Sequence, residues 1–221
     1  MSNNENIFNT RQRNIGFRSS DIAAIFYLIL VTCGVIYLVL NVQGHPFLLA
    51  YIKFFFLATF GECLRRRITQ DNWIPDHLIS RALIWGCFGV WIAMSFMIMD
   101  SGVRWFVGTS SLSRPVTAFA ISAWMNIFSG YGFFMMLTHF ITDRMLDEGI
   151  KAPTEYLRSN GFPRWAKIVG LCLIFFWTPA HTITFLLPNI WRVVFAAYLS
   201  VALGAILSFA SDSGSRSAHT A

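Results

Sequence analysis

The side chains in this sequence that are best suited to chemistry are polar groups inside long apolar runs. Lys53 lies six residues into the run 47–63, and His181 lies six residues before the end of the run 165–187. If both runs are membrane helices in opposite directions, ~1.5 Å per residue puts each group roughly 9 Å from the same membrane edge. An ionisable group at that depth is costly unless it has a partner or water, so these two positions are candidates for a solute path.

Three neighbours strengthen this candidate. Thr178, His181 and Thr182 share one helical face through three- and four-residue spacing, and Arg192 lies just inside the next run. Together with Lys53 they could form an outer cationic vestibule, which would favour anions. The alternative is that Lys53 and Arg192 extend their charges to the membrane surface and that His181 makes a single interhelical hydrogen bond.

The run 116–141 carries a second polar stripe. Asn126 lies about ten residues in, near the middle of a bilayer, and His139 and Asp143 follow four residues apart near the other end. This stripe could line a narrow wet path, or its small and polar residues could simply hold helices together. On a helical wheel it occupies an arc of roughly 140° and consists of Ala118, Ser122, Asn126, Ser129, Gly132, His139 and Asp143.

The last apolar run has small residues at every fourth position. Ala196, Ser200, Gly204 and Ser208 form a small-xxx-small face, which predicts a close helix contact. The partner is either another helix of the same chain or a second copy in a homo-oligomer.

The composition explains why so few residues are candidates. Of 221 residues, 55% are hydrophobic and 13% are charged, about half the usual share of charge, which excludes a disordered chain and disfavours a soluble domain. The net charge of +6 is scattered between apolar runs, so nucleic acid is not an expected partner.

The sequence has no HExxH, GxSxG or Walker motif and no CxxC pair, and we expect neither an enzyme nor a metal or cofactor site. His139 and His181 lie near opposite edges, which argues against a shared haem.

Six apolar runs organise the chain, and each is close to the roughly 20 helical residues that cross a bilayer. The sequence therefore predicts an all-α, polytopic integral membrane protein. We expect a polar segment 1–21, a six-helix membrane domain 22–209 and a flexible tail 210–221. Pro179 should kink the fifth helix and free the carbonyl of Phe175. The runs are 22–42, 47–63, 79–99, 116–141, 165–187 and 190–209.

The charges predict the orientation. With the N-terminus in the cytoplasm, thirteen Lys and Arg residues fall on the inner side and three on the outer side, a strong positive-inside bias. Both termini would then be cytoplasmic, and the charges would contact anionic lipid. The first run is too long for a signal peptide and lacks a cleavage motif, so it is interpreted as a retained helix.

The segment 177–196, WTPAHTITFLLPNIWRVVFA, resembles the C-terminal signature of the Mpv-seventeen/peroxisomal membrane protein family. Where the family signature has a glutamine this sequence has His181, and where the signature has an asparagine this sequence has Thr184. The interval between the two prolines of the signature is about one residue shorter here. Gly61-Glu62 is similar to a Gly-acid pair of that family, and the resemblance covers about residues 47–207. The matching residues are Trp177, Thr178, Pro179, Pro188, Arg192, Val193, Phe195 and Ala196.

The resemblance implies a channel-forming or channel-modulating membrane protein. We therefore expect a small, weakly selective channel or transporter for small solutes or anions, with Asn126 at the constriction. The alternative is a structural or accessory membrane protein without a conduction path. The absence of a transit peptide and the extra first helix favour a bacterial cytoplasmic membrane; a eukaryotic member would be peroxisomal or in the inner mitochondrial membrane.

Overall fold

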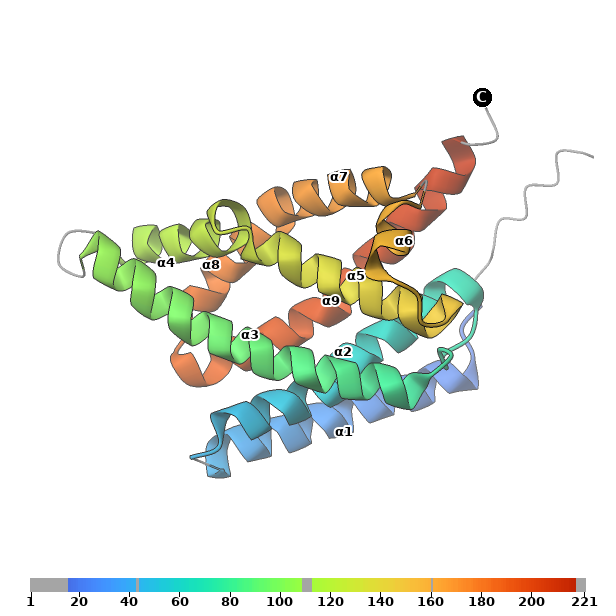
Figure 1. Ribbon diagram of the computed structural model, residues 1–221. Coiled ribbons are helices and arrows are strands. Elements are labelled where there is room, and N and C mark those ends of the chain that lie inside the picture. Colours follow the sequence, from blue (N-terminus) through green and yellow to red (C-terminus); the bar gives the residue numbers. More distant parts are fainter. Residues whose placement is uncertain (1–15, 43, 109–112, 160, 218–221) are drawn as a thin grey trace, which may run out of the picture.

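The computed structural model describes residues 16–42, 44–108, 113–159 and 161–217, with side chains described as far as Gly204 except those of residues 106 and 107. Within these ranges every regular element is a helix (Figure 1), so the predicted all-α class is confirmed. The helices are α1 (Ser19–Asn41), α2 (Pro46–Gln70), α3 (Leu78–Val107), α4 (Arg114–Ala123), the π-helical turn η1 (Trp124–Phe128), α5 (Tyr131–Glu148), α6 (Pro153–Leu157), α7 (Phe162–Cys172), the π-helical turn η2 (Leu173–Trp177), α8 (Thr178–Leu186) and α9 (Asn189–Ser217).

Four stretches are long and apolar enough to cross a membrane: α1, α2, most of α3, and the continuous helix Phe162–Leu186. They correspond to the first, second, third and fifth predicted runs. A fifth crossing is possible only if Arg114–Phe128 and Tyr131–Glu148 together form one broken span. The apolar part of α9 within the described side chains, Asn189–Gly204, is about 24 Å long. The structure thus supports four to five candidate crossings, fewer than the six predicted.

The fourth run is not the single helix that the sequence predicted. Its two halves meet at 52°, because the chain widens into η1 and then turns at Ser129-Gly130. Gly130 has a φ of +71°, a left-handed conformation that glycine adopts without the steric cost of a side chain. Asn126 lies inside η1, at the interruption itself.

The fifth run is interrupted in a milder way. Pro179 lies in the first turn of α8 and follows the π-helical turn η2 directly. The predicted kink therefore takes the form of a wide turn within a helix that still counts as one 25-residue stretch. The Thr178 hydroxyl donates to the Leu173 carbonyl across this turn, at 2.7 Å.

Two helices extend beyond their apolar runs because ion pairs hold their ends. The second apolar run ends at residue 63, but α2 continues to Gln70. Arg67 is buried near its end and donates to both carboxylate oxygens of Asp21, at 2.7 and 2.9 Å. Trp73 Nε1 also donates to Asp21, at 2.7 Å. Asp21 belongs to α1, which begins at Ser19, so the first helix starts inside the segment predicted to be polar coil.

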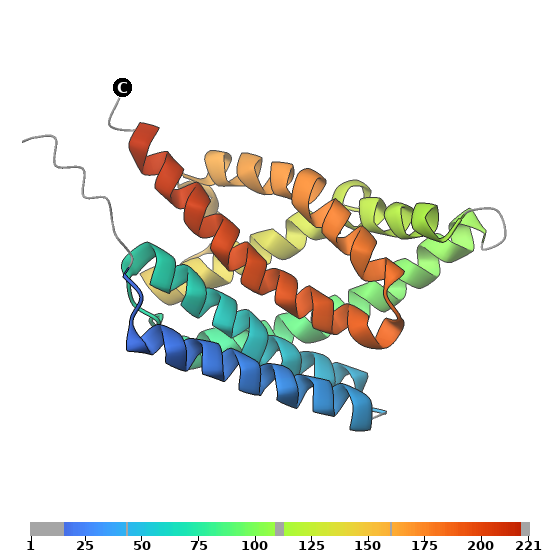
Figure 2. The same cartoon turned by 180° about the vertical axis from the view of Figure 1, so that it is seen from behind.

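At the other end of the chain, α9 continues through residue 217, into the tail 210–221 that was expected to be flexible. Residues 1–15 and 218–221 lie outside the described part. Figures 1 and 2 show the first residues of α1 and the last residues of α9 at the same end of the bundle.

The small-residue face of α9 contacts α2. A Cβ atom on Gly204 would lie 2.4 Å from the Gly61 carbonyl oxygen, and one on Gly61 would lie 2.7 Å from the Ser200 carbonyl oxygen. Ala196 and Ser200 are buried in the same interface, whereas the side chain of Ser208 lies outside the described residues. The predicted close contact is thus made within the chain, and a second copy would have to use another face.

The two interrupted helices pack against each other. The helices α4 and α8 lie side by side, α5 contacts α7, and the turns η1 and η2 touch between them. In Figures 1 and 2 the α4–α5 and α7–α8 pairs cover one side of the bundle, with α1 and α2 on the other. Both helix interruptions therefore lie at the same level of the bundle, where the candidate site is found.

Candidate functional site

A cavity of about 70 Å³ lies between the two interrupted helices and α2, α3 and α9. Its wall is mainly aromatic and aliphatic. Hydrogen-bonding side chains such as Asn126, His181 and Ser200 come from the two interrupted helices and from α9. Occupancy of about 10–15 Å³ is enough to hold one water molecule, so the cavity has room for several waters or a small solute group. The lining residues are Phe54, Trp85, Phe88, Ile92, Phe96, Met125, Asn126, Tyr131, Gly132, Met135, Met136, His139, Leu173, Trp177, His181, Ala196, Ser200 and Leu203.

Asn126 and His181 meet at the crossing of the two helices. The Asn126 amide lies 3.1 Å (nitrogen) and 3.2 Å (oxygen) from Nδ1 of His181. Four residues before Asn126, the buried Ser122 hydroxyl donates to the Thr178 carbonyl, at 2.6 Å. These contacts join α4 and η1 to α8 beside the interruptions of the two helices. They also hold the His181 imidazole in the cavity wall.

The two cavity histidines lie at different levels. The ring of His181 contacts Phe96 and Trp177, with centroids 5.5 and 5.1 Å apart. The ring of His139 contacts Phe88 at 5.7 Å. Phe88 and Phe96 are eight residues apart on α3, a rise of about 12 Å. The cavity therefore extends along α3 from one imidazole to the other, as the separate depths of these histidines in the sequence implied.

Three buried polar atoms of lining residues lack a hydrogen-bond partner among the described residues: the Tyr131 hydroxyl oxygen, Nδ1 of His139 and Nε1 of Trp177. Buried polar atoms are nearly always satisfied by protein or ordered water. An indole N–H can only donate a hydrogen bond, so the molecule that satisfies Trp177 must carry an acceptor. The cavity is thus suited to water or to a small solute with acceptor atoms.

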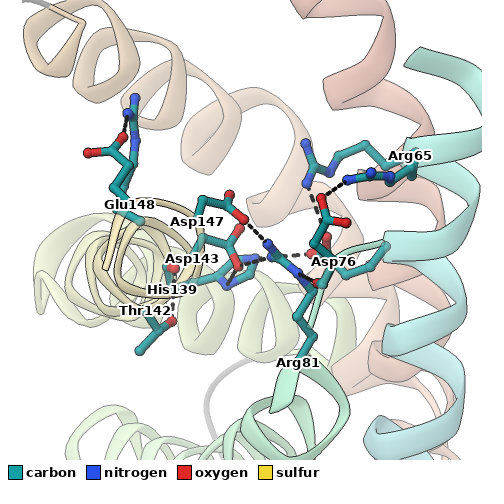
Figure 3. A network of polar contacts seen from close by, with 11 residues as sticks. Arg65, Asp76, Arg81, His139, Thr142, Asp143, Asp147 and Glu148 are labelled. Atoms are coloured by element: carbon teal, nitrogen blue, oxygen red, sulfur yellow. Dashed lines mark hydrogen bonds and ion pairs between the residues drawn. The ribbon is translucent and has the colours of Figure 1, made fainter. Parts of the chain in front are cut away.

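A network of charged side chains adjoins the cavity at His139 (Figure 3). Glu62 is only 7% exposed and accepts a hydrogen bond from Arg65, at 3.2 Å. Arg81 is 4% exposed and pairs with both Asp143, at 2.8 Å, and Asp147. His139 lies between these pairs, with Nε2 3.6 Å from Glu62 Oε1 and Nδ1 3.9 Å from Asp143 Oδ1.

Arg81 was not among the candidate residues that the sequence suggested. The structure shows it as the residue that ties α3 to α5. Its η-nitrogens bind carboxylates four residues apart on α5, while Nε donates to the Asp76 carbonyl at 2.9 Å. The i, i+4 spacing of Asp143 and Asp147 was the available signal, since it places two carboxylates on one helical face.

Glu62, His139 and Asp143 also offer ligand atoms within 4.8 Å of one another, a spacing that a metal ion could use. The guanidinium groups of Arg65 and Arg81 already bind the two carboxylates. A divalent cation would have to displace these charges or be repelled by them. We therefore assign no metal to this cluster.

The predicted outer vestibule is not assembled around the cavity. Lys53, Thr178, Thr182 and Arg192 do not line it. The hydroxyl of Thr182 donates to the Thr178 carbonyl, at 2.7 Å. Lys53 is 5% exposed and makes no hydrogen bond or ion pair within the described residues.

Arg192 has a different role from the one expected. Its guanidinium donates to the carbonyls of Leu187 and Phe185, both at 3.1 Å, and lies 3.3 Å from an Asp100 carboxylate oxygen. It therefore caps the C-terminal end of α8 and neutralises a carboxylate of α3. Among the residues that match the family signature, Trp177 lines the cavity, whereas Pro179 starts α8 and Pro188 directly precedes α9.

Three of the predicted path residues line one cavity: Asn126, His139 and His181. Asp143 adjoins it through His139. Comparisons with protein-family models, with curated proteins and with solved structures find no match to this chain.

Proposed function

We propose that this chain is a multi-pass membrane protein that carries small polar solutes, anions among them, through the central cavity. The observation that carries the proposal is the cavity itself: it lies at two helix interruptions, and its wall includes three buried polar atoms, on Tyr131, His139 and Trp177, that have no hydrogen-bond partner among the described residues. A bilayer offers no water to such atoms, so they are tolerated where a cavity or a ligand satisfies them.

The arrangement of the chain supports this proposal. Non-helical or widened backbone at membrane depth is typical of transporters, whose binding sites are built by discontinuous helices near the bilayer midplane. η1 and η2 are two such interruptions, and they contact each other. The aromatic wall and the small volume favour a carrier or a narrow, weakly selective path over a wide pore.

The membrane topology belongs to the same proposal. Six crossings with both termini in the cytoplasm would make the broken pair α4–α5 one span and α9 another. Thirteen inner against three outer basic residues support this orientation, and the bacterial cytoplasmic membrane is the proposed location. The resemblance of segment 177–196 to the Mpv-seventeen family supports a solute-conducting role.

One observation favours a structural or accessory role instead. Ser122 and Asn126 hydrogen-bond to Thr178 and His181, so these polar groups also join the two interrupted helices. If the role is structural, replacing these residues would lower the stability of the protein, and the wild-type protein itself would show no solute flux.

Reconstitution into liposomes separates these functions. We expect the full-length protein to speed the passage of nitrate, L-lactate or sorbitol over protein-free liposomes, and Asn126→Ala to lower that rate at least tenfold. Asn41→Ala is the matched control, since Asn41 is exposed and its side-chain amide donates to the Tyr37 carbonyl of its own helix. Wild-type liposomes that retain all three probes as protein-free liposomes do would contradict the proposal. A lower melting temperature of Asn126→Ala without any wild-type flux would identify the structural role.

A further inference from the structure

The charged cluster beside the cavity is short of one positive charge. Four carboxylates, those of Glu62, Asp76, Asp143 and Asp147, face three guanidinium groups, those of Arg65, Arg66 and Arg81. Arg81 alone serves two carboxylates. When the His139 imidazole is neutral, the cluster therefore carries one uncompensated negative charge, and its most buried carboxylate, that of Glu62, is only 7% exposed.

His139 is the group placed to supply the missing charge. Its two nitrogens face carboxylates of different helices, Glu62 on α2 and Asp143 on α5, at 3.6 and 3.9 Å. These distances are just too long for hydrogen bonds, and Nδ1 has no hydrogen-bond partner among the residues that the structure describes. A protonated imidazole has two N–H donors, so one added proton and a shift of a few tenths of an ångström would create two charge-assisted hydrogen bonds.

The charged groups around His139 come from three helices and one loop. Glu62 and Arg65 lie on α2, Arg81 on α3, Asp143 and Asp147 on α5, and Asp76 in the α2–α3 loop. Figure 3 shows Asp143, Asp147 and Arg81 together beside the imidazole, whereas Glu148 lies apart. The aromatic neighbours of His139 on α3 are Trp85 and Phe88, with ring centroids 4.5 and 5.7 Å from that of His139. From α8 and α9, the described residues that line the cavity include one further histidine, His181 of α8.

The position of His139 also connects the charged cluster to water on one side and to the cavity on the other. On one side, Asp147 is 49% exposed and shares Arg81 with Asp143, so the cluster reaches water. On the other side, His139 lines the cavity that holds Asn126 and His181. A proton taken from water thus changes the charge and the donors of the cavity wall without the transfer of any other group.

We infer that Glu62, His139 and Asp143 form a proton-binding site and that one proton moves with the solute carried by this protein. The proton adds to a ring nitrogen of His139, forming an imidazolium between the two carboxylates, and it is released when the solute leaves. This inference rests on the proposed function for its coupling step, whereas proton binding itself is a property of the cluster.

Proton binding is tested on the full-length protein in nanodiscs, without any solute. An imidazolium beside an indole quenches its fluorescence, so we expect tryptophan emission to fall reversibly as the pH is lowered from 8.5 to 5.0. Trp85→Phe and His139→Gln should lose the part of this change that comes from the Trp85–His139 contact, and Glu62→Gln should reduce it. His45→Gln, in an exposed loop position, is the control. An unchanged pH response in His139→Gln would overturn the proton site.

Coupling is tested in liposomes with labelled sorbitol. An imposed pH gradient, acid outside, should drive sorbitol above its external concentration in wild type at least fivefold more than in His139→Gln, while both variants still exchange internal for external sorbitol. Equal accumulation in the two would overturn the coupling. If wild type exchanges none of sorbitol, nitrate and L-lactate, the proposed function is contradicted, and the fluorescence result alone decides proton binding.

Discussion

Replacing Arg81 with methionine should destabilise the protein more than any other single loss of charge in the cluster, by about 2 kcal/mol, because the carboxylates that it leaves behind are partly exposed. Arg81 is 4% exposed and binds Asp143 and Asp147 together. Removing it leaves the carboxylates of Asp143 and Asp147 without this counter-charge, close to the buried carboxylate of Glu62. Thermal unfolding in detergent, followed by circular dichroism, measures this loss as a lower melting temperature.

Two variants keep this prediction specific. Arg66→Met removes a guanidinium paired with Asp76, which is 68% exposed, and should cost less than about 1 kcal/mol, as exposed pairs usually do. Adding Asp143→Asn and Asp147→Asn to Arg81→Met should recover much of the stability, because the unpaired charges are then gone. Equal melting temperatures for Arg66→Met and Arg81→Met would show that the cluster does not tie α3 to α5 as described.

Filling the central cavity should abolish solute passage while preserving the fold. Met136 lines the cavity from α5, and tryptophan at this position would occupy much of its volume of about 70 Å³. We expect Met136→Trp to lower the liposome flux of nitrate, L-lactate or sorbitol at least tenfold. The cost of overpacking, about 1–3 kcal/mol, should leave the protein folded.

Met97→Trp provides the matched comparison, because Met97 lies on α3 and is 57% exposed. It should retain wild-type flux. If Met136→Trp carries solute as fast as Met97→Trp does, the path does not run through this cavity.

Much of the fold was accessible from the sequence because apolar run length is a direct consequence of bilayer thickness. Four runs became helices of the expected kind. The interruption of the fourth run was missed, since a single Gly130 in an apolar run is no clear signal without knowledge of its φ. The helix ends were also missed: the extension of α2 depends on Arg67 pairing with Asp21, a contact between residues 46 positions apart.

The candidate site was predicted in part. Helical periodicity placed Asn126 and His139 on one face, and both line the cavity. Matched depth placed Lys53 beside His181, but depth alone does not fix which face of a helix a residue occupies, and Lys53 does not line the cavity. The pairing of Arg192 with Asp100 and of Arg81 with α5 depends on which helices are neighbours, which the sequence does not reveal.

The most direct test of the account asks whether the cavity holds water. In a background with Cys33, Cys63, Cys87 and Cys172 replaced by serine or alanine, Met136→Cys and Met97→Cys are reconstituted and treated with 2-aminoethyl methanethiosulfonate. This reagent reacts with thiolates, which form in water and not in hydrocarbon. We predict rapid modification of Met136→Cys and little of Met97→Cys. A cysteine at position 136 that stays unmodified, with the protein folded, would mean a dry interior and contradict a solute path at this site.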